Sequence, residues 1–245
     1  MRIAIVNPNA TSSMTETIAA AARRVAAAGT EIVAITNEDG PASIEGHVDG
    51  ALAVPGLLNR IVRAEAEGAN AHIIACFDDT GLDAARSLAR KPVVGIGEAG
   101  AHMASLVARR FAVVTTLDCA VTLQEENLAK SGLSGACCGV RSCEVPVLDL
   151  ESDPEAAAKI SEEIERAIRD DRAEAIVLGC AGMAEFAARL SQRHGLPVID
   201  GVAAAVKLAE GLVAMGLTSS RRGGYAAPRP KARPFGLTNM PPSEP

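Results

Sequence analysis

Short apolar runs alternate with segments of helical spacing along most of the chain. A short apolar run bounded by turn residues predicts a buried strand, and apolar positions three and four apart predict an amphipathic helix. The predicted strands are 2–6, 31–36, 73–76, 110–116, 143–147 and 175–179, and the predicted helices are 14–28, 46–66, 82–89, 121–131, 154–168, 184–190 and 203–215. This order indicates parallel sheets with helices on both faces, joined by right-handed connections.

Proline residues refine two of these helices. Pro55 and Gly56 lie inside the segment 46–66 and are expected to interrupt its helix. Asp153 is expected to cap the helix 154–168, with Pro154 at its first helical position.

The second half of the chain repeats the pattern of the first. The run Ile73 to Cys76 has a counterpart in Ile176 to Cys180, and each run ends in a cysteine where a strand passes into a helix. The segment 91–95 resembles 196–200 at nearly the same distance from its cysteine, and 110–116 resembles 2–8. We interpret this as an internal duplication that gives two α/β halves, 1–105 and 106–202, related by a pseudo-two-fold axis with a cleft between them.

The remainder of the chain follows the second half. Residues 203–218 are expected to form a C-terminal helix, and residues 219–245 a disordered tail, because Gly, Pro and basic residues bury too little to fold. The tail carries five basic residues against the single acid Glu244, namely Arg221, Arg222, Arg229, Lys231 and Arg233.

Composition excludes several classes of protein. Of the 245 residues, 48% are hydrophobic but only 2% aromatic, which indicates an aliphatic globular core. The net charge of -6 disfavours nucleic acid as a partner. No apolar run reaches the roughly 18 to 20 residues of a membrane span, and the first apolar run is too short for a signal peptide. We therefore expect a cytoplasmic protein that binds no membrane.

Cysteines supply the candidate chemistry. Ligands of open α/β sheets bind beyond the carboxyl ends of the strands, and Cys76 and Cys180 both fall there. If the two halves pack with these edges facing, the two thiols meet across one cleft, which Asn9, Thr115 and Thr116 would also line. A lone cysteine at a strand end is usually a small hydrophobic residue, but the repeat of cysteine at both ends favours a function.

Two thiols on opposite sides of a substrate suit the removal of a proton from one face of a carbon and its return to the other. The product of such a reaction is a racemate or an epimer, and no cofactor or metal is required. Helix N-termini would stabilise the developing enolate and lower a thiol pKa from about 8.5 toward neutrality. Asp78 is awkward beside a thiolate because its charge raises the thiol pKa, and Asp79 is expected to cap a helix. The spacing of Cys137, Cys138 and Cys143 does not match a zinc site.

The chain resembles the aspartate/glutamate racemase superfamily, and within it the hydantoin racemase branch. The segments that carry the resemblance lie within residues 1–217 and are Val6-Asn7-Pro8-Asn9, Pro41-Ala42-Ser43-Ile44-Glu45-Gly46, Cys76-Phe77-Asp78-Asp79, Gly81-Leu82-Asp83 and Gly179-Cys180-Ala181-Gly182-Met183. The resemblance implies a cofactor-independent racemase of 5-substituted hydantoins, active as a homo-oligomer, with Cys76 and Cys180 as its two bases. It also implies that further residues contact the ring or fix the loops, namely Asn9, Ser43, Ile44, Asp78, Thr80, Thr115, Thr116 and Gly182. Thr80 stands where the pattern would have a proline.

Other activities remain open at this stage. An allantoin racemase or an aspartate or glutamate racemase of the same superfamily would share the two thiols. A decarboxylase of this kind is expected to have one catalytic cysteine, so the pair argues against it. A two-lobed small-molecule-binding protein could use the same cleft but has no need of opposed thiols.

Overall fold

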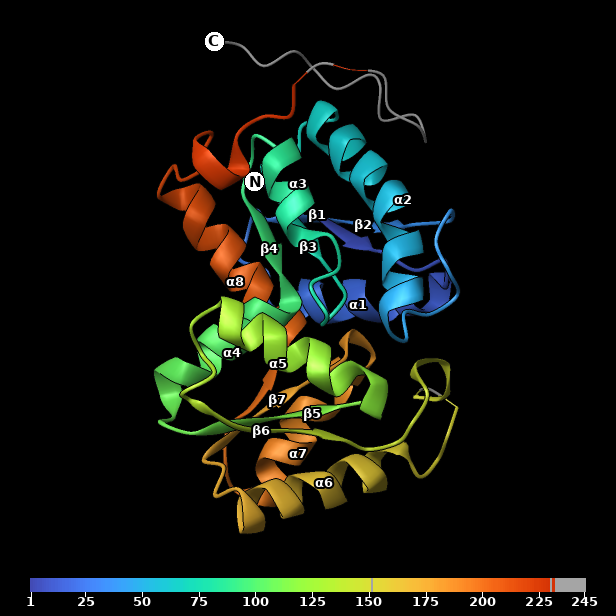
Figure 1. Ribbon diagram of the computed structural model, residues 1–245, viewed down its shortest axis with the longest axis vertical. Coiled ribbons are helices and arrows are strands. Elements are labelled where there is room, and N and C mark those ends of the chain that lie inside the picture. The colour runs from blue at the N-terminus through green and yellow to red at the C-terminus, as the bar shows by residue number, and fades with distance from the viewer. Residues whose placement is uncertain (151, 230, 232–245) are drawn as a thin grey trace.

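Two four-stranded parallel sheets form the frame of the molecule (Figure 1). The computed structural model describes residues 1–150, 152–229 and 231. The first sheet has the order β2-β1-β3-β4 and the second the order β6-β5-β7-β8. The strands are β1 Arg2–Asn7, β2 Glu31–Thr36, β3 Ala71–Ile74, β4 Val93–Gly95, β5 Phe111–Thr115, β6 Cys137–Ser142, β7 Ala175–Leu178 and β8 Val198–Asp200. Counted from its own first strand, each sheet has the same order, so the predicted fold of two parallel-sheet α/β halves is confirmed.

Helices follow most strands as the sequence pattern predicts, and residues 96–107 form a further helix that the pattern did not identify. The helices are α1 Ser12–Val25, α2 His47–Ala66, α3 Leu82–Leu88, α4 Ile96–Val107, α5 Val121–Lys130, α6 Ala156–Asp170, α7 Ala187–His194 and α8 Gly201–Ala214. Four 3-10 turns complete the set, η1 Asp118–Ala120, η2 Val147–Asp149, η3 Ala181–Phe186 and η4 Gly223–Tyr225. Within the described part of the chain, no helix combines the length and the apolar character that crossing a membrane requires.

One apolar core joins the two sheets. It contains Ile5 and Ile73 of the first sheet, Val113 and Val177 of the second, and Val206 of α8, and α4 and α8 pack against one another between the sheets (Figure 1). The chain therefore passes from the second sheet through α8 back to the first, where α8 contacts β3 and β4. Burial of a shared aliphatic core fixes the position of one sheet relative to the other.

The second strand of the second half lies earlier than the sequence predicts. Residues 143–147 are expected to form it, but the strand is β6, Cys137–Ser142, at the edge of the second sheet. The edge position explains the polar composition of β6, since only one side of an edge strand is paired. The buried residues Cys143 and Val145 still donate their N–H groups to Thr115 O (3.0 Å) and Thr116 O (3.2 Å), so the backbone stays close to β5 beyond the strand.

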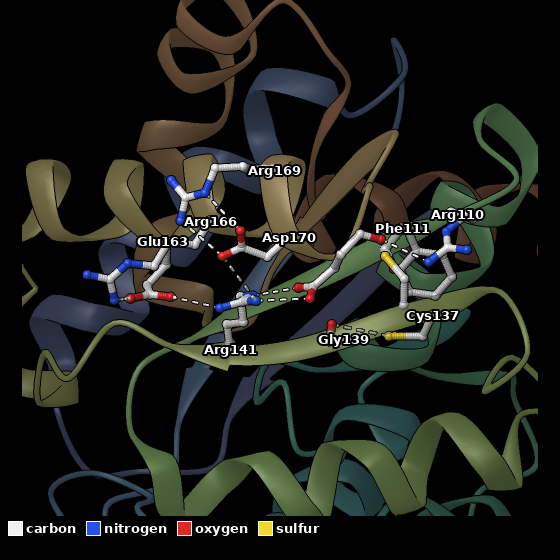
Figure 2. A network of polar contacts seen from close by, with 11 residues as sticks. Arg110, Phe111, Cys137, Gly139, Arg141, Glu163, Arg166, Arg169 and Asp170 are labelled. Carbon is white, nitrogen blue, oxygen red and sulfur yellow. Dashed lines mark hydrogen bonds and ion pairs between the residues drawn. The ribbon is translucent and has the colours of Figure 1, made fainter.

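An ionic network holds β6 against α6 (Figure 2). Arg141 of β6 donates from Nε to Asp171 Oδ2 (2.5 Å) and from Nη2 to Asp171 Oδ1 (2.9 Å), the bidentate geometry typical of arginine with a carboxylate. Glu163 and Asp170 lie 3.8 and 4.0 Å from the same guanidinium. The thiols of Cys137 and Cys138 donate to the carbonyls of Gly139 and Phe111 (Figure 2).

The predictions for the two helices that contain proline hold only in part. Helix α2 runs without a break through Pro55, although proline leaves the carbonyl four residues earlier without its donor. Gly56 leaves room there for the side chain of Asn37, whose Nδ2 donates to Ala53 O (3.0 Å) and braces this turn of the helix. Helix α6 begins at Ala156 rather than after Asp153, whose carboxylate accepts from the N–H of Glu155 (2.8 Å).

Part of the segment expected to be disordered packs against α3. Arg221 Nη1 donates to the carbonyls of Ser87 (3.2 Å) and Ala89 (3.0 Å), and the Tyr225 hydroxyl donates to Asp83 Oδ1 (3.1 Å). Two long side chains thus give this basic segment contacts that its low hydrophobicity does not predict. Residues 230 and 232–245 of the predicted tail lie outside the described residues.

Candidate active site

A small cavity lies where the carboxyl ends of the two sheets meet. Its volume is about 40 Å³, and both Cys76, after β3, and Cys180, after β7, line it. Five of the other predicted site residues also line it, namely Asn9, Ile44, Asp78, Thr115 and Thr116. The lining comes from segments that follow β1, β2 and β3 of the first sheet and β5, β6 and β7 of the second. Such a site is expected at the carboxyl edges of parallel sheets.

The remaining three predicted residues lie beside the cavity rather than on its surface. Thr80 is buried and its hydroxyl donates to Cys76 Sγ (3.4 Å). Gly182 donates its N–H to the Cys180 thiol, and a Cβ there would lie 3.8 Å from Sγ. Ser43 is partly exposed and belongs to the loop that places Ile44 on the lining. Thr80 and Gly182 therefore contact the thiols, whereas Ser43 does not line the cavity.

The loop after Cys76 is held by its neighbouring helix. Asp79, in the left-handed conformation at φ 50°, accepts from the N–H groups of Gly97 (2.9 Å) and Glu98 (2.8 Å) at the start of α4. A Cβ on Gly95 or Gly97 would overlap this carboxylate or the Phe77 carbonyl, so both positions require glycine. Asp79 is thus a helix cap, as predicted, but it caps α4 rather than the helix that follows it.

The loop before Cys180 depends on a close approach between two strands. Gly179 lies so near Thr115 that a Cβ would come within 2.8 Å of Thr115 Cα. The Thr115 hydroxyl donates to Gly179 O (3.2 Å), and the Gly179 N–H donates to Val114 O (2.8 Å). Glycine therefore allows the end of β7 to lie against the end of β5 and presents Cys180 to the cavity.

Hydrogen bonds within the first loop fix Asn9. Its Oδ1 accepts from Asn7 Nδ2 (2.8 Å) and from the N–H of Thr11 (3.0 Å), and its Nδ2 approaches Met14 Sδ (3.5 Å). Because Oδ1 is already engaged twice, Nδ2 is the atom of Asn9 with hydrogen-bonding capacity left for a ligand.

Burial raises the pKa of both candidate catalytic thiols. Desolvation raises the pKa of Cys180 to about 12, with further contributions from Asp78, Cys143 and Glu45. Desolvation, followed by the charge of Asp78, raises the pKa of Cys76 still further above its ordinary range, despite hydrogen bonds from Thr80 and the Asp78 N–H. The expectation that helix dipoles would lower a thiol pKa is wrong. One main-chain N–H group reaches each sulfur, from Asp78 at Cys76 and from Gly182 at Cys180, which is too few to offset burial beside a carboxylate.

Residues that sequence reasoning missed complete the cavity. Gln124 of α5 donates from Nε2 to Asp78 Oδ1 (3.1 Å) and to Thr115 Oγ1 (2.8 Å). Glu45 accepts from the N–H of Val147 (3.0 Å) and so connects the loop after β2 to the segment after β6. Gln124 shares the buried face of α5 with Leu128, and nothing in the sequence shows which loop this face meets.

A larger groove adjoins the cavity at Asp78. It measures about 620 Å³, and Asp78 lines both spaces. Its polar lining residues, contributed by α2 to α5, the loop after β3 and η4, include His47, Thr80, Asp83, Arg86, His102, Asn127, Lys130 and Tyr225. No group of three or more metal-ligating side chains occurs among the residues that the structure describes.

Known proteins share this chain's sequence and fold. The family model described as Asp/Glu/Hydantoin racemase matches residues 3–209. A hydantoin racemase of Rhizobium meliloti is 48% identical over 233 residues, which cover 95% of this chain and 97% of that protein. The structure of an allantoin racemase from Klebsiella pneumoniae is 46% identical, covers 99% of both chains and superimposes with a TM-score of 0.95. An allantoin racemase from Pseudomonas fluorescens is 45% identical and covers 95% of this chain and 99% of its own, with a TM-score of 0.92.

Proposed function

The chain belongs to the Asp/Glu/hydantoin racemase family, and on this premise we propose that it racemises 5-substituted hydantoins with Cys76 and Cys180 as a pair of acid-base groups. The observation that carries the proposal is the placement of two cysteines at equivalent strand ends on one cavity. The two thiols are near enough for the charge of Cys180 to raise the pKa of Cys76. A substrate carbon in this cavity would have one sulfur on each side.

The proposed reaction is a proton transfer across the C5 carbon. One cysteine, as a thiolate, removes the C5 proton from one face and becomes a thiol. The other cysteine, as a thiol, delivers a proton to the opposite face and becomes a thiolate. The pair has then exchanged protonation states, so the same site accepts the other enantiomer. Asp78, which lines the cavity beside both sulfurs, is the group that would accept a ring N–H.

The raised thiol pKa values set the pH dependence of this reaction. Because the active form needs one thiolate, and because thiolate is scarce below the pKa, kcat/KM should rise with pH through the neutral and alkaline range. Nothing in the proposed steps requires a metal or an organic cofactor.

The groove beside Asp78 indicates where the 5-substituent would lie. The cavity measures only about 40 Å³, whereas the groove offers about 620 Å³ and is lined by polar side chains such as His47 and Lys130 beside apolar ones such as Val54. The polar side chains favour a substituent that can itself form hydrogen bonds. The ureido group of allantoin, itself a 5-substituted hydantoin, meets this requirement better than a benzyl group does.

Loss of optical rotation on pure enantiomers tests the proposal. The panel is allantoin, 5-isopropyl-, 5-methylthioethyl- and 5-benzylhydantoin, aspartate and glutamate, each with an enzyme-free control for spontaneous racemisation. We expect turnover of the hydantoin ring compounds, with a higher kcat/KM for allantoin than for benzylhydantoin, and no turnover of the amino acids. Turnover of aspartate or glutamate alone would contradict the proposal.

A further inference from the structure

Gln124 is a buried polar residue that the proton transfer does not use. It is 2% exposed, lies on α5 and lines the catalytic cavity. Its Nε2 donates to Asp78 Oδ1 (3.1 Å) and to Thr115 Oγ1 (2.8 Å). Asp78 is two residues from Cys76, and Thr115 contacts the residue before Cys180. A single amide group therefore contacts both cysteine loops, directly or through one hydroxyl.

The direction of these hydrogen bonds fixes the orientation of the amide. The Thr115 hydroxyl has one hydrogen, which it donates to Gly179 O (3.2 Å), so its oxygen accepts from Gln124. Asp78, when ionised, can only accept. Both partners thus require the Nε2 end of Gln124. Three hydrogen bonds connect the loops in series, from Asp78 through Gln124 and Thr115 to Gly179.

We propose that Gln124 is a positioning residue that ties the Cys76 loop to the Cys180 loop and so sets the relation between the two thiols. It comes from α5, which is separate from both loops, and its contacts reach one loop after a strand of each sheet. Such a connection between the loops matters for a reaction with two acid-base groups, because both sulfurs must lie within reach of the same substrate carbon.

The other end of the amide supports a role beyond stability. Within the described residues, Gln124 Oε1 is buried and has no hydrogen-bond partner. A buried acceptor without a partner is costly, and an apolar side chain of the same shape would avoid that cost. The N–H groups are therefore the part of this amide that forms hydrogen bonds.

Asn127, one turn further along α5, offers a matched comparison. Its Nδ2 donates to the main-chain carbonyl of Asp78 (2.8 Å), so it holds the same loop without touching the carboxylate or Thr115. A variant at Asn127 therefore loosens the Cys76 loop alone, whereas a variant at Gln124 releases both loops.

The hydrogen bond from Gln124 also affects the pKa of the Asp78 carboxyl group. Burial raises the pKa of Asp78, and the hydrogen bond from Gln124 and the charge of His47 lower it. Loss of Gln124 should thus raise this pKa. The other titratable or charged groups that line the cavity or the adjoining groove are Glu45, Cys76, Cys119 and Cys180, and Asp79, Asp83, Arg86, Glu98, His102, Lys130 and Tyr225.

Amide hydrogen exchange followed by mass spectrometry tests whether Gln124 connects the two loops, without a measurement of enzyme activity. In Gln124→Met, which keeps the length of the side chain, we expect faster exchange in peptides covering both 76–81 and 179–186. In Asn127→Leu we expect it in 76–81 only. Unchanged exchange in 179–186 of Gln124→Met would overturn the proposal, whatever the substrate of the protein proves to be.

The pH profile provides a second test, which rests on the proposed function. We expect kcat for the preferred hydantoin to fall about 10- to 100-fold in Gln124→Met. The ratio of variant to wild-type kcat/KM should decrease further as the pH falls, because Asp78 becomes protonated at a higher pH. In Asn127→Leu the ratio should not vary with pH. A ratio for Gln124→Met that is independent of pH would contradict its action on Asp78.

Thr115→Val carries the test if Gln124→Met does not fold. This substitution removes the hydrogen bonds from Gln124 to Thr115 and from Thr115 to Gly179, and it leaves the hydrogen bond from Gln124 to Asp78 in place. We expect kcat to be reduced by the same factor at every pH, and amide hydrogen exchange to be faster in the peptide 179–186. Wild-type kcat in this variant would overturn the proposal, whereas inactivity of the wild-type protein on every hydantoin would refute only the proposed substrate class.

Discussion

At the scale of single residues, the raised pKa values of the two thiols affect the stability of the fold as well as the proposed proton transfer. Their pKa values are raised because the protein removes water from them and places Asp78 beside them. A thiol that stays protonated in the fold but ionises on unfolding binds more protons in the native state. Stability must then fall as the pH rises above the unfolded thiol pKa of about 8.5 to 9.

The free energy of unfolding should report these thiols directly. In wild-type protein it is expected to decrease between pH 9 and 11, by at most about 1.4 kcal/mol per pH unit for each thiol, and by less because both cysteines are partly exposed. The double variant Cys76→Ala/Cys180→Ala should lose less stability over the same interval, because these two thiols are absent. Some loss should remain, because Cys137 and Cys143, whose pKa values are raised to about 11, are present in both proteins. Urea denaturation at each pH gives the comparison, and equal losses would show that neither thiol is desolvated.

The residues that the sequence could predict are those that follow a strand directly. Cys76, Cys180, Thr115 and Thr116 are placed by strand ends, and the duplication brings them to one cavity. Gln124 could not be predicted in the same way, because a position on a helix face does not reveal which loop it meets across the molecule. The sequence indicated that the charge of Asp78 raises the thiol pKa, but it did not show the larger effect of burial, which depends on groups that are distant in sequence.

At the scale of elements, the cap of α4 determines where the Cys76 loop lies. Asp79 reaches the first N–H groups of α4, where a carboxylate is favoured by both hydrogen bonding and the helix dipole. Gly95 and Gly97 provide the space for it. The end of β3, the loop and the start of α4 therefore form one connected unit.

Gly97→Ala should disrupt this unit. The added Cβ would overlap the Phe77 carbonyl, and overpacking of this kind costs about 1–3 kcal/mol of stability. We expect the free energy of unfolding to fall by that amount, and kcat/KM to fall with it because the Cys76 loop must move. Gly211→Ala is the control, because no atom lies within 4 Å of its Cβ position on α8 and alanine favours the helix. Equal stability of the two variants would exclude the close packing at Gly97.

Many elements were predictable from periodicity, but helix α4 and the three-residue strands β4 and β8 were not, and two further departures have local causes. Strand β6 lies at a sheet edge and holds Arg141 and Ser142, so its pattern is too polar to identify beside the more apolar segment 143–147. Helix α2 continues through Pro55, and Asn37 from the loop after β2 donates to Ala53 O at this turn. In both places a tertiary contact outweighs the local preference of the sequence.

At the scale of the whole molecule, the two sheets and the helices between them keep the two cysteine loops at a fixed distance. The core shared through α4 and α8, the link from Glu45 to Val147 and the series through Gln124 all join the two halves around the cavity. A fold of two repeated α/β units explains why one chain can present the same side chain from two sides. The sequence predicted this arrangement through its internal repeat, but it did not reveal the return of α8 to the first sheet.

Exchange of the C5 proton with deuterium in single cysteine variants tests the two-thiol reaction most directly. Each pure enantiomer of the preferred hydantoin is incubated in deuterated buffer, where proton NMR follows the exchange and polarimetry follows the racemisation. Cys137→Ser, in β6, serves as the control for loss of a cysteine. Cys76→Ser and Cys180→Ser should both lose racemisation, and each should still exchange the proton of one enantiomer only, the opposite one in each variant. Full racemisation by either variant, or exchange of the same enantiomer by both, would contradict a mechanism in which the two cysteines act from opposite faces.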